Sequence, residues 1–214
     1  HLGHHMRNRS DDEAFDFYFE GENPLWKFLQ LYGTMLGFFW IVAFLSNFMA
    51  AFAPRVLRSK NASFDRPTQA FLEALNPRYE RVIQREALAI ILFHATFIFF
   101  FQIPLLNWFL TLFGFGFLWS AMQYVHHFGT TRDVRHVAKN LRTFAVLDFL
   151  WMNHNWHLNH HQRPTVPWIH LPKLSSDPAA EIRDGLFLSY LKMWRGPRLT
   201  SERVQNRYAG KIIK

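Results

Sequence analysis

Three long apolar runs restrict the fold of this chain more than any other feature of its sequence. They cover residues 32–53, 87–103 and 105–125. A helix of about 20 residues, rising about 1.5 Å per residue, spans the apolar layer of a bilayer. Because backbone amides in lipid must find their partners within the protein, helices are the simplest structure that can cross. The runs therefore predict an all-α, integral membrane helical protein.

Composition narrows the class of protein further. The length of 214 residues fits one domain, and we treat 1–214 as a single domain. The net charge of +8 is compatible with nucleic-acid binding or with basic cytoplasmic flanks of a membrane protein. The apolar runs and the 24 phenylalanines favour the second interpretation, so no nucleic-acid partner is expected. The absence of cysteine excludes disulfides, zinc fingers and thiolate catalysis.

Prolines and charges suggest how the runs are arranged. Asn76 before Pro77 is a typical helix start, and this helix continues into the second run. Another start is expected before Pro67. Pro104 separates the second run from the third, so 87–125 is predicted to form a crossing hairpin. The basic stretch 54–86 prefers the cytoplasm, which leaves the first run dipping into the membrane or lying at its surface. The alternative is that the first and second runs cross.

Histidines repeat with the same spacing at two distant places, in "HLGHH" and "HLNHH". On a helix, offsets of three and four residues place side chains on one face. Residues 143–161 are predicted as one helix, which adds Asn153 and His154 to the arc of the second motif. Neutral imidazole binds iron, zinc or copper. The motifs therefore predict an all-imidazole site, large enough for two metals, at one membrane face.

Several other kinds of metal or ligand site are disfavoured. The chain has no HExxH motif and no ExxH motif, which excludes a zinc protease and a carboxylate di-iron bundle. His94 is the single histidine in the middle of an apolar run, so a haem between paired histidines is not expected. We interpret His94 as a contact between helices. A tail helix is expected from Asp177 and Pro178 to about Trp194.

The segments "HLGHH", "QYVHHFGTTRDVRHVAKNLR" and "NHNWHLNHHQRPTVPWIHLPKL" resemble the membrane fatty acid desaturase family, particularly its bacterial members. The resemblance extends from residue 1 to about residue 195 and is strongest across 120–175. It implies a helical membrane fold with a cytosolic histidine-box cap, here 126–175, at the bacterial inner membrane. It also implies two irons, O2 as co-substrate, a fatty acyl lipid as substrate and an electron donor such as a ferredoxin, rubredoxin or cytochrome b5-type protein.

The resemblance also assigns residues. The first motif matches the second histidine box of the family, and the second motif matches the third. His127 matches an extra histidine after the last membrane helix, whereas His126 points about 100° away, so one of the two should bind. Asn153 falls where relatives carry an asparagine, and His154 is either a ligand or an outer partner. The expected metal ligands are His1, His4, His5, His127, His157, His160 and His161; no catalytic residue beyond them is expected.

The family's first box is absent, so we expect an N-terminal fragment that lacks upstream membrane helices and that box. The predicted reaction is O2-dependent insertion of a double bond into a fatty acyl chain. A lipid or carotenoid hydroxylase or ketolase of the same superfamily is the alternative. A membrane metal carrier is disfavoured because only His94 offers a ligand along a span. The basic run is a solvated face or a docking site for the electron donor; it consists of Arg132, Arg135, Lys139 and Arg142.

Overall fold

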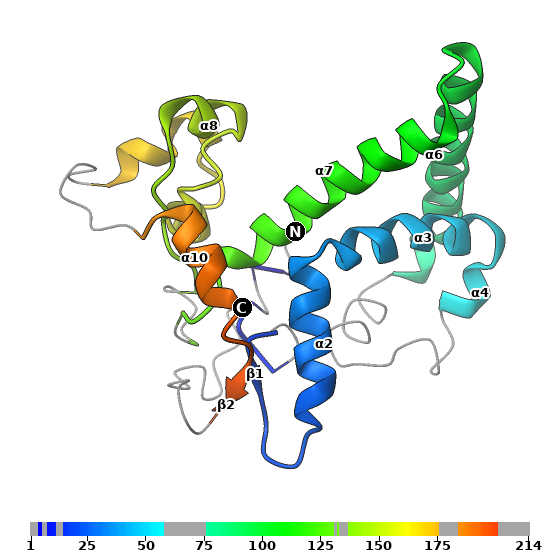
Figure 1. Cartoon of the computed structure of the whole chain (residues 1–214). Coiled ribbons are helices and arrows are strands. Elements are labelled where there is room, and N and C mark those ends of the chain that lie inside the picture. Colours follow the sequence, from blue (N-terminus) through cyan, green and yellow to red (C-terminus); the bar gives the residue numbers. More distant parts are fainter. Residues whose placement is uncertain are drawn as a thin grey trace. The chain divides into compact units, whose positions relative to one another are not determined.

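The computed structural model describes residues 4–5, 8–11, 15–57, 76–130, 132, 137–175 and 184–200, and these are mostly helical (Figure 1). The chain divides into two compact units. Gly33–Ser120 forms the first, which we call the helix unit. His1–Tyr32 and Ala121–Lys214 form the second, which we call the histidine unit. Helices α2 (Pro24–Met35) and α7 (Leu105–Val125) each begin in one unit and end in the other.

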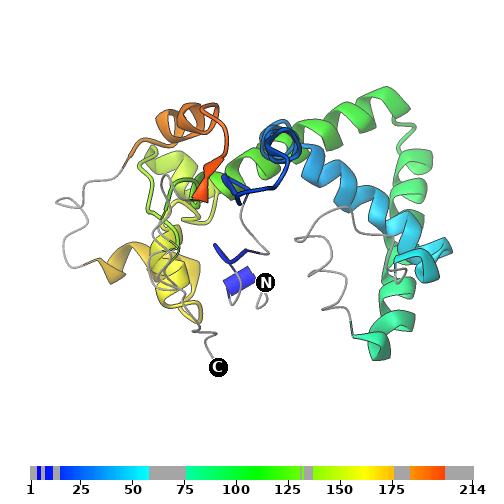
Figure 2. The same cartoon turned by 90° about the horizontal axis from the view of Figure 1, so that it is seen from below.

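Helix α6 (Glu80–Phe100) begins where the sequence predicts. The Asn76 side chain accepts a hydrogen bond from the Arg78 backbone N–H at 2.9 Å, and Pro77 opens the 3₁₀ turn η1 (Pro77–Tyr79) that leads into α6. The chain turns after Phe100, and α6 and α7 diverge from this turn (Figures 1 and 2). Both Pro77–Phe100 and α7 are long and apolar enough to cross a membrane. The prediction of two candidate spans separated near Pro104 is therefore confirmed.

The first apolar run is bent rather than straight. Helix α3 (Phe38–Phe52) follows α2 after Gly37, and Pro24–Met35 and Trp40–Phe52 meet at 90°. Gly37 has φ 92°, and a Cβ there would lie 2.9 Å from the Cα of Phe117, so only glycine fits without strain. Such a pair is either a broken span or a re-entrant loop, which gives two or three spans by length and composition. Both predicted topologies therefore stay predictions.

Small residues let the helices of the helix unit approach one another. Ala50 and Ala51 of α3 are buried with Ala87 of α6, and Gln84 donates to the Ala51 carbonyl at 2.8 Å. A Cβ at Gly116 of α7 would collide with the Trp40 ring. A four-residue helix, α4 (Pro54–Leu57), follows α3. The predicted helix start at Pro67 lies outside the described residues.

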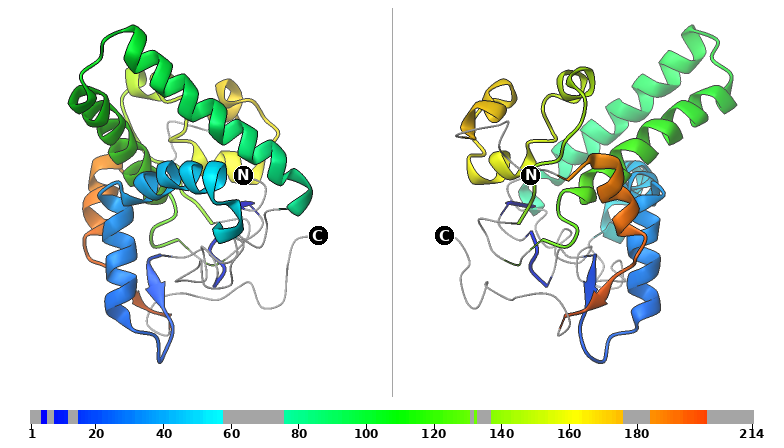
Figure 3. Two further views of the ribbon diagram at one scale, coloured as in Figure 1. Left: turned by 90° about the vertical axis from the view of Figure 1, so that its right-hand side faces the viewer. Right: turned by 60° about the vertical axis from the view of Figure 1, so that its left-hand side comes forward.

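The histidine unit is built from short elements. Strands β1 (Phe17–Tyr18) and β2 (Arg198–Leu199) pair in parallel, as the blue and orange arrows of Figure 3 show. Helix α8 (Ala145–Leu150), helix α9 (His157–Gln162), the 3₁₀ segment η2 (Trp168–Leu174) and helix α10 (Leu186–Met193) complete it. Within this unit, Tyr32 of α2 stacks on Trp194, which follows α10, with ring centroids 5.4 Å apart.

The prediction of one helix across 143–161 is wrong. Helix α8 ends at Leu150, Met152 and Asn153 both have φ 51°, and α9 begins only at His157. Left-handed backbone interrupts a right-handed helix. Asn155 then pairs with Leu141, because the Leu141 N–H donates to the Asn155 carbonyl at 2.8 Å and the Asn155 side chain donates to the Leu141 carbonyl at 3.1 Å. These bonds hold 151–156 away from the helical path.

The tail helix also differs from its predicted start. Helix α10 begins at Leu186. Gly185, its N-cap, has an extended backbone conformation. Its last residue, Met193, lies next to the expected end at Trp194. The expected start at Asp177 and Pro178 lies outside the described residues.

Candidate metal centre

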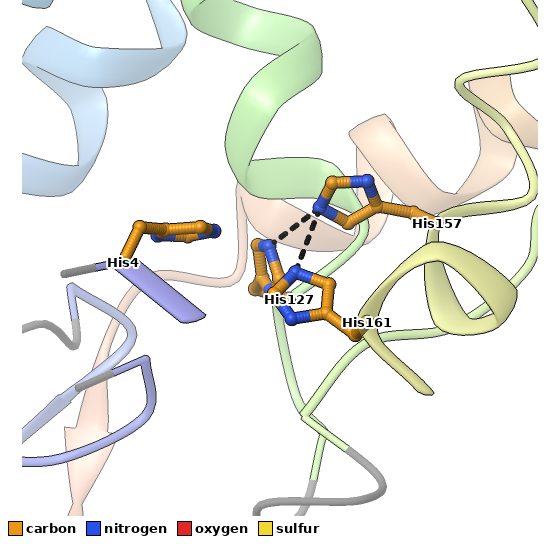
Figure 4. Close-up of side chains that lie close together, drawn as sticks. All are labelled: His4, His127, His157 and His161. Carbon is orange, nitrogen blue, oxygen red and sulfur yellow. Dashed lines mark hydrogen bonds between the residues drawn. The ribbon is translucent and has the colours of Figure 1, made fainter. Parts of the chain in front are cut away.

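Four histidines converge in the histidine unit, although they come from three separate segments. Ring nitrogens of His4, His127, His157 and His161 all lie within 4.8 Å of one another (Figure 4). His4 belongs to the N-terminal segment, His127 follows the end of α7, and the other two project from α9. We call this group the histidine cluster.

Helix α9 presents two members of the cluster from one face. His157 and His161 are four residues apart, and their Nε2 atoms lie 3.2 Å from one another. The helix has only 6 residues, so the helix propensity of these residues is too weak to keep it folded without contacts to the rest of the unit. Asn140 supplies the missing cap from outside, because its Oδ1 accepts the N–H groups of Leu158 at 3.0 Å and Asn159 at 3.3 Å.

His127 reaches the cluster from the turn that ends α7. Its Nδ1 lies 2.8 Å from the Val137 carbonyl, which places the proton on Nδ1 and leaves the lone pair on Nε2. That Nε2 lies 3.0 Å from Nε2 of His157. The Asn8 amide nitrogen lies between two rings, 3.3 Å from Nε2 of His4 and 2.9 Å and 3.2 Å from Nδ1 and Nε2 of His127. The ring orientation of His127 is thus fixed on two sides.

Burial keeps three members of the cluster uncharged at physiological pH, namely His127, His157 and His161. Burial, followed by the neighbouring His127, lowers the pKa of His157 well below its ordinary value. Burial and then His4 do the same to the pKa of His127, and burial and then His127 lower that of His161. Neutral rings keep their lone pairs, which is the form that binds metals.

The spacing of these nitrogens fits a transition metal. Ligand nitrogens about 2.1 Å from one ion are separated by about 3.0 Å in octahedral and about 3.4 Å in tetrahedral geometry. The Nε2 separations of 3.0 Å and 3.2 Å fall in this interval. All-imidazole donor sets suit iron, zinc and copper. The cluster can therefore hold such an ion.

A second pair of imidazoles lies beside the cluster. Nε2 of His5 is 3.1 Å from Nε2 of His160, and the His5 ring centroid is 4.3 Å from that of His161. Burial, then the charge interaction with His160, lowers the pKa of His5 to about 4. The Nε2 separation of this pair matches those within the cluster, so the two rings are candidate ligands of a second ion. His1, the remaining predicted ligand of the first motif, lies outside the described residues.

The three less regular candidates lie around the cluster. His126 is fully buried, with its ring centroid 4.9 Å from that of His157 and 5.1 Å from that of His154. Burial lowers the pKa of His154 to about 4. The Asn153 side chain donates to the Trp168 carbonyl at 3.3 Å. Because α9 starts after Asn153, the argument that one helix carries it on the histidine arc no longer holds.

Arg132 contradicts the interpretation of the basic run as a solvated face, because it is buried. It pairs with Asp11, and its Nε donates to the Arg9 carbonyl at 2.9 Å. Lys139 donates to the Phe128 carbonyl at 3.1 Å, and burial lowers its pKa. Arg142 is exposed, and Arg135 lies outside the described residues. The burial of Arg132 could not be predicted from the sequence, because a buried arginine in a basic run has the same sequence pattern as an exposed one.

Sequence reasoning also missed the polar residues that support the histidines. Asn8 contacts His4 and His127, and Asn140 caps α9. Asp16 belongs to an acidic stretch that reads as surface, but it is only 6% exposed. A signal was present in "FDFYF", where aromatic residues surround the carboxylate at 15–19.

Comparison with known proteins adds the family. A family model described as fatty acid desaturase matches residues 1–195 of the 214. Comparisons with curated proteins and with solved structures give no significant match. The family match, the two candidate spans and the histidine cluster agree with one another. The chain therefore belongs to the fatty acid desaturase family, which implies a membrane oxidoreductase with a lipid substrate.

Proposed function

We propose that the protein is a membrane-bound di-iron fatty acyl desaturase, which uses O2 and external electrons to insert a double bond. The observation that carries this proposal is the histidine cluster, in which imidazole nitrogens from three segments lie within 4.8 Å of one another. Its location is proposed as a bacterial inner membrane, with the site at the cytoplasmic face.

The proposed ligands fall into two groups. The histidine cluster holds the first iron, and His5 and His160 hold the second together with His1. The separations of 3.0–3.2 Å between Nε2 atoms in both groups support this division. Zinc and copper accept the same donors, so the choice of iron rests on the family.

Bound iron would supply the activation of O2 and the electron transfer that no amino-acid side chain can perform. The overall reaction removes two hydrogens from adjacent methylenes and takes two electrons and two protons from outside. It forms one carbon–carbon double bond and converts one O2 to two waters. The chain's own part is to keep the imidazoles neutral, to hold them at fixed separations and to keep water from the buried rings.

His126 is assigned to orienting His157 rather than to binding iron. His126 Nδ1 lies 3.3 Å from the Lys139 carbonyl, which leaves its Nε2 as an acceptor. Within the described part of the chain, His126 Nε2 and His157 Nδ1 are both buried without a hydrogen-bond partner, and the two rings are adjacent. A histidine that donates its second N–H to a fixed acceptor is held in one tautomer. We assign His154 and Asn153 to the same outer layer.

The deciding experiment expresses the complete gene in a host that lacks desaturases and analyses its lipids by mass spectrometry. Loss of two hydrogens from an acyl chain supports the proposal, whereas gain of an oxygen would identify a hydroxylase or ketolase instead. The His160→Ala variant should lose the product, and the matched variant His170→Ala, at an exposed histidine, should keep it. Unchanged lipids with the wild-type gene and each candidate electron donor would contradict both alternatives.

A further inference from the structure

A buried network of charges joins the N-terminal segment to the end of α7. Arg9 and Asp16 form an ion pair at 0% and 6% exposure, and Tyr124 of α7 donates to Asp16 at 2.7 Å. Arg9 also donates to the Tyr124 hydroxyl at 3.1 Å. We call these three residues the buried triad. No member of the triad is among the clustered histidines.

Each member of the triad also bonds to the backbone across the junction. The second Arg9 nitrogen donates to the Thr130 carbonyl at 2.7 Å, and the Gly129 N–H donates to Asp16 at 2.7 Å. The Tyr124 hydroxyl accepts the Phe15 N–H at 2.8 Å. Two segments that are distant in sequence, 9–16 and 124–130, are therefore joined by several hydrogen bonds, and those that involve Arg9 or Asp16 are charge-assisted and hence of the stronger kind.

Both segments that the buried triad joins also carry residues of the histidine cluster or residues that contact it. His127 follows Tyr124 by three residues and precedes Gly129 by two, and Asn8, next to Arg9, touches the rings of His4 and His127. Arg9 has φ 65°, a left-handed conformation that a non-glycine residue keeps only when its surroundings enforce it. The bonds of its side chain and of its carbonyl, which Arg132 holds, provide that enforcement.

The cost of burying these charges points to a positional role. Buried ion pairs seldom stabilise a fold more than apolar side chains of the same size, and their best supported use is to fix one arrangement. Apolar packing alone would let the N-terminal segment slide against α7. An arginine whose two terminal nitrogens donate to fixed acceptors on different residues, as those of Arg9 do, favours one register.

We propose that the buried triad of Arg9, Asp16 and Tyr124 is a positioning device that holds the N-terminal histidine motif in register with His127. The part of this inference that concerns metal binding rests on the proposed function. The part that concerns register does not, because it describes the distance between two segments of the chain.

The experiment uses four single variants in two matched pairs. Tyr124→Phe removes one hydroxyl from the triad, and Tyr32→Phe removes the hydroxyl that bonds the Trp194 carbonyl at 3.1 Å. Asp16→Asn neutralises the triad's carboxylate, and Asp184→Asn neutralises the carboxylate that pairs with Lys192 at 2.8 Å. The control residues belong to the same unit but lie outside the triad and the cluster.

The first measurement reports register without any metal. The chain has no cysteine, so Glu20→Cys and Gln162→Cys, both at exposed positions, give two unique sites for spin labels. Pulsed electron paramagnetic resonance should give one narrow distribution of distances between the two labels in the wild-type background and in both control variants. The two triad variants should broaden or shift it. Narrow, unshifted distributions in the folded triad variants would overturn the proposal whether or not the protein binds metal.

The second measurement reports the effect on the site. The wild-type protein loaded with Co²⁺ should show an absorption spectrum typical of nitrogen ligands, and Tyr124→Phe should change that spectrum and weaken affinity about 10–100-fold, as loss of an outer partner does. Tyr32→Phe should match the wild type. Absence of Co²⁺ binding by the wild type would count against the proposed function alone, because the distance measurement still decides the register.

Discussion

The two units bury opposite kinds of side chain. In the helix unit the buried contacts between α3 and α6 are alanines, while large apolar side chains face outward, among them Leu92 at 65% and Phe93 at 64% exposure. In the histidine unit many buried side chains are polar. They include Asn8, Arg9, Asp16, His126, His127, Arg132, Asn140, Asn155, His157, Asn159 and Ser189.

The contrast shows which surroundings each unit is built for. A helix pair that buries alanine and exposes leucine and phenylalanine suits a solvent of lipid tails, where small residues permit close backbone contact. Polar groups inside a unit need partners, and imidazoles with lowered pKa values keep the lone pairs that can bind a metal ion. The candidate spans and the candidate metal centre therefore lie mainly in different units, and each can be probed by its own substitutions.

The largest effect should come from removing a histidine of the cluster. His157→Ala should lower metal content and product formation by more than about 100-fold, beyond the range expected for an outer partner. His94→Ala removes a histidine of the helix unit, where Trp108 donates to its Nδ1 at 3.4 Å, and it should retain the metal. Metal analysis of both purified variants checks this. Equal loss in the two variants would erase the distinction between the units.

A lower pH should destabilise the metal-free histidine unit. The folded pKa values of His5 and His154 are about 4, below the value of about 6.5 for an unfolded chain. Between these values the unfolded state binds more protons, so the free energy of unfolding falls as pH falls below about 6.5. The slope reaches at most about 1.4 kcal/mol per pH unit for the buried His154, and it is smaller for the partly exposed His5 because solvent screens its interactions. Above that pH the contribution is constant.

Thermal unfolding of metal-free protein from pH 7.5 to 5 measures this dependence. A probe attached to a single cysteine in α3 should show little shift over the same range, because the described contacts of α3 with α6 are apolar or involve neutral amides. A midpoint for the histidine unit that stays constant with pH would contradict the neutral, buried state of its imidazoles.

A charge on the outward face of α6 should prevent membrane integration. Leu92→Lys places an ammonium near the middle of a candidate span, at a cost of about 2.5–3.5 kcal/mol. Leu92→Ala removes the same side chain without adding charge and should integrate normally. Extraction of membranes at alkaline pH separates integrated from loosely attached protein. Equal retention of the two variants would show that Leu92 does not face lipid.

The smallest effect should come from single neutral hydrogen bonds. Asn140→Ala leaves two N–H groups at the start of α9 without their cap and should cost about 1–2 kcal/mol of stability. Trp108→Phe removes the bond to His94 in the helix unit and should cost about 0.6 kcal/mol. Chemical unfolding in detergent compares them. A larger loss for Trp108→Phe would reverse the expected order of polar contacts in the two units.

The sequence predicts features that depend on neighbouring residues. Asn76 and Pro77 signal a helix start locally, and the spacing of His157 and His161 places them on one face of any helix. The break at Met152 could not be foreseen, because methionine has no preference for left-handed backbone and the contacts of Asn155 with Leu141 arise only in the folded unit.

The burial of charged side chains could not be predicted from the sequence for a related reason. Asp16 looks like part of a solvated acidic stretch until Arg9 and Tyr124 are placed beside it. Arg132 likewise becomes an internal residue only once Asp11 and the Phe17 ring approach it, the latter at 4.9 Å. The burial of both side chains depends on partners at long sequence separation, and a single amino-acid sequence does not identify those partners.

The shortness of α9 links the folding of the histidine unit to the supply of metal ions in the cell. A six-residue helix depends on outside contacts for its existence, and two of its side chains belong to the cluster. An ion that binds the folded form alone shifts the population toward that form by mass action. The amount of intact enzyme in a cell should therefore follow the supply of the metal, with starved molecules degraded as unfolded chains rather than stored as an inactive reserve.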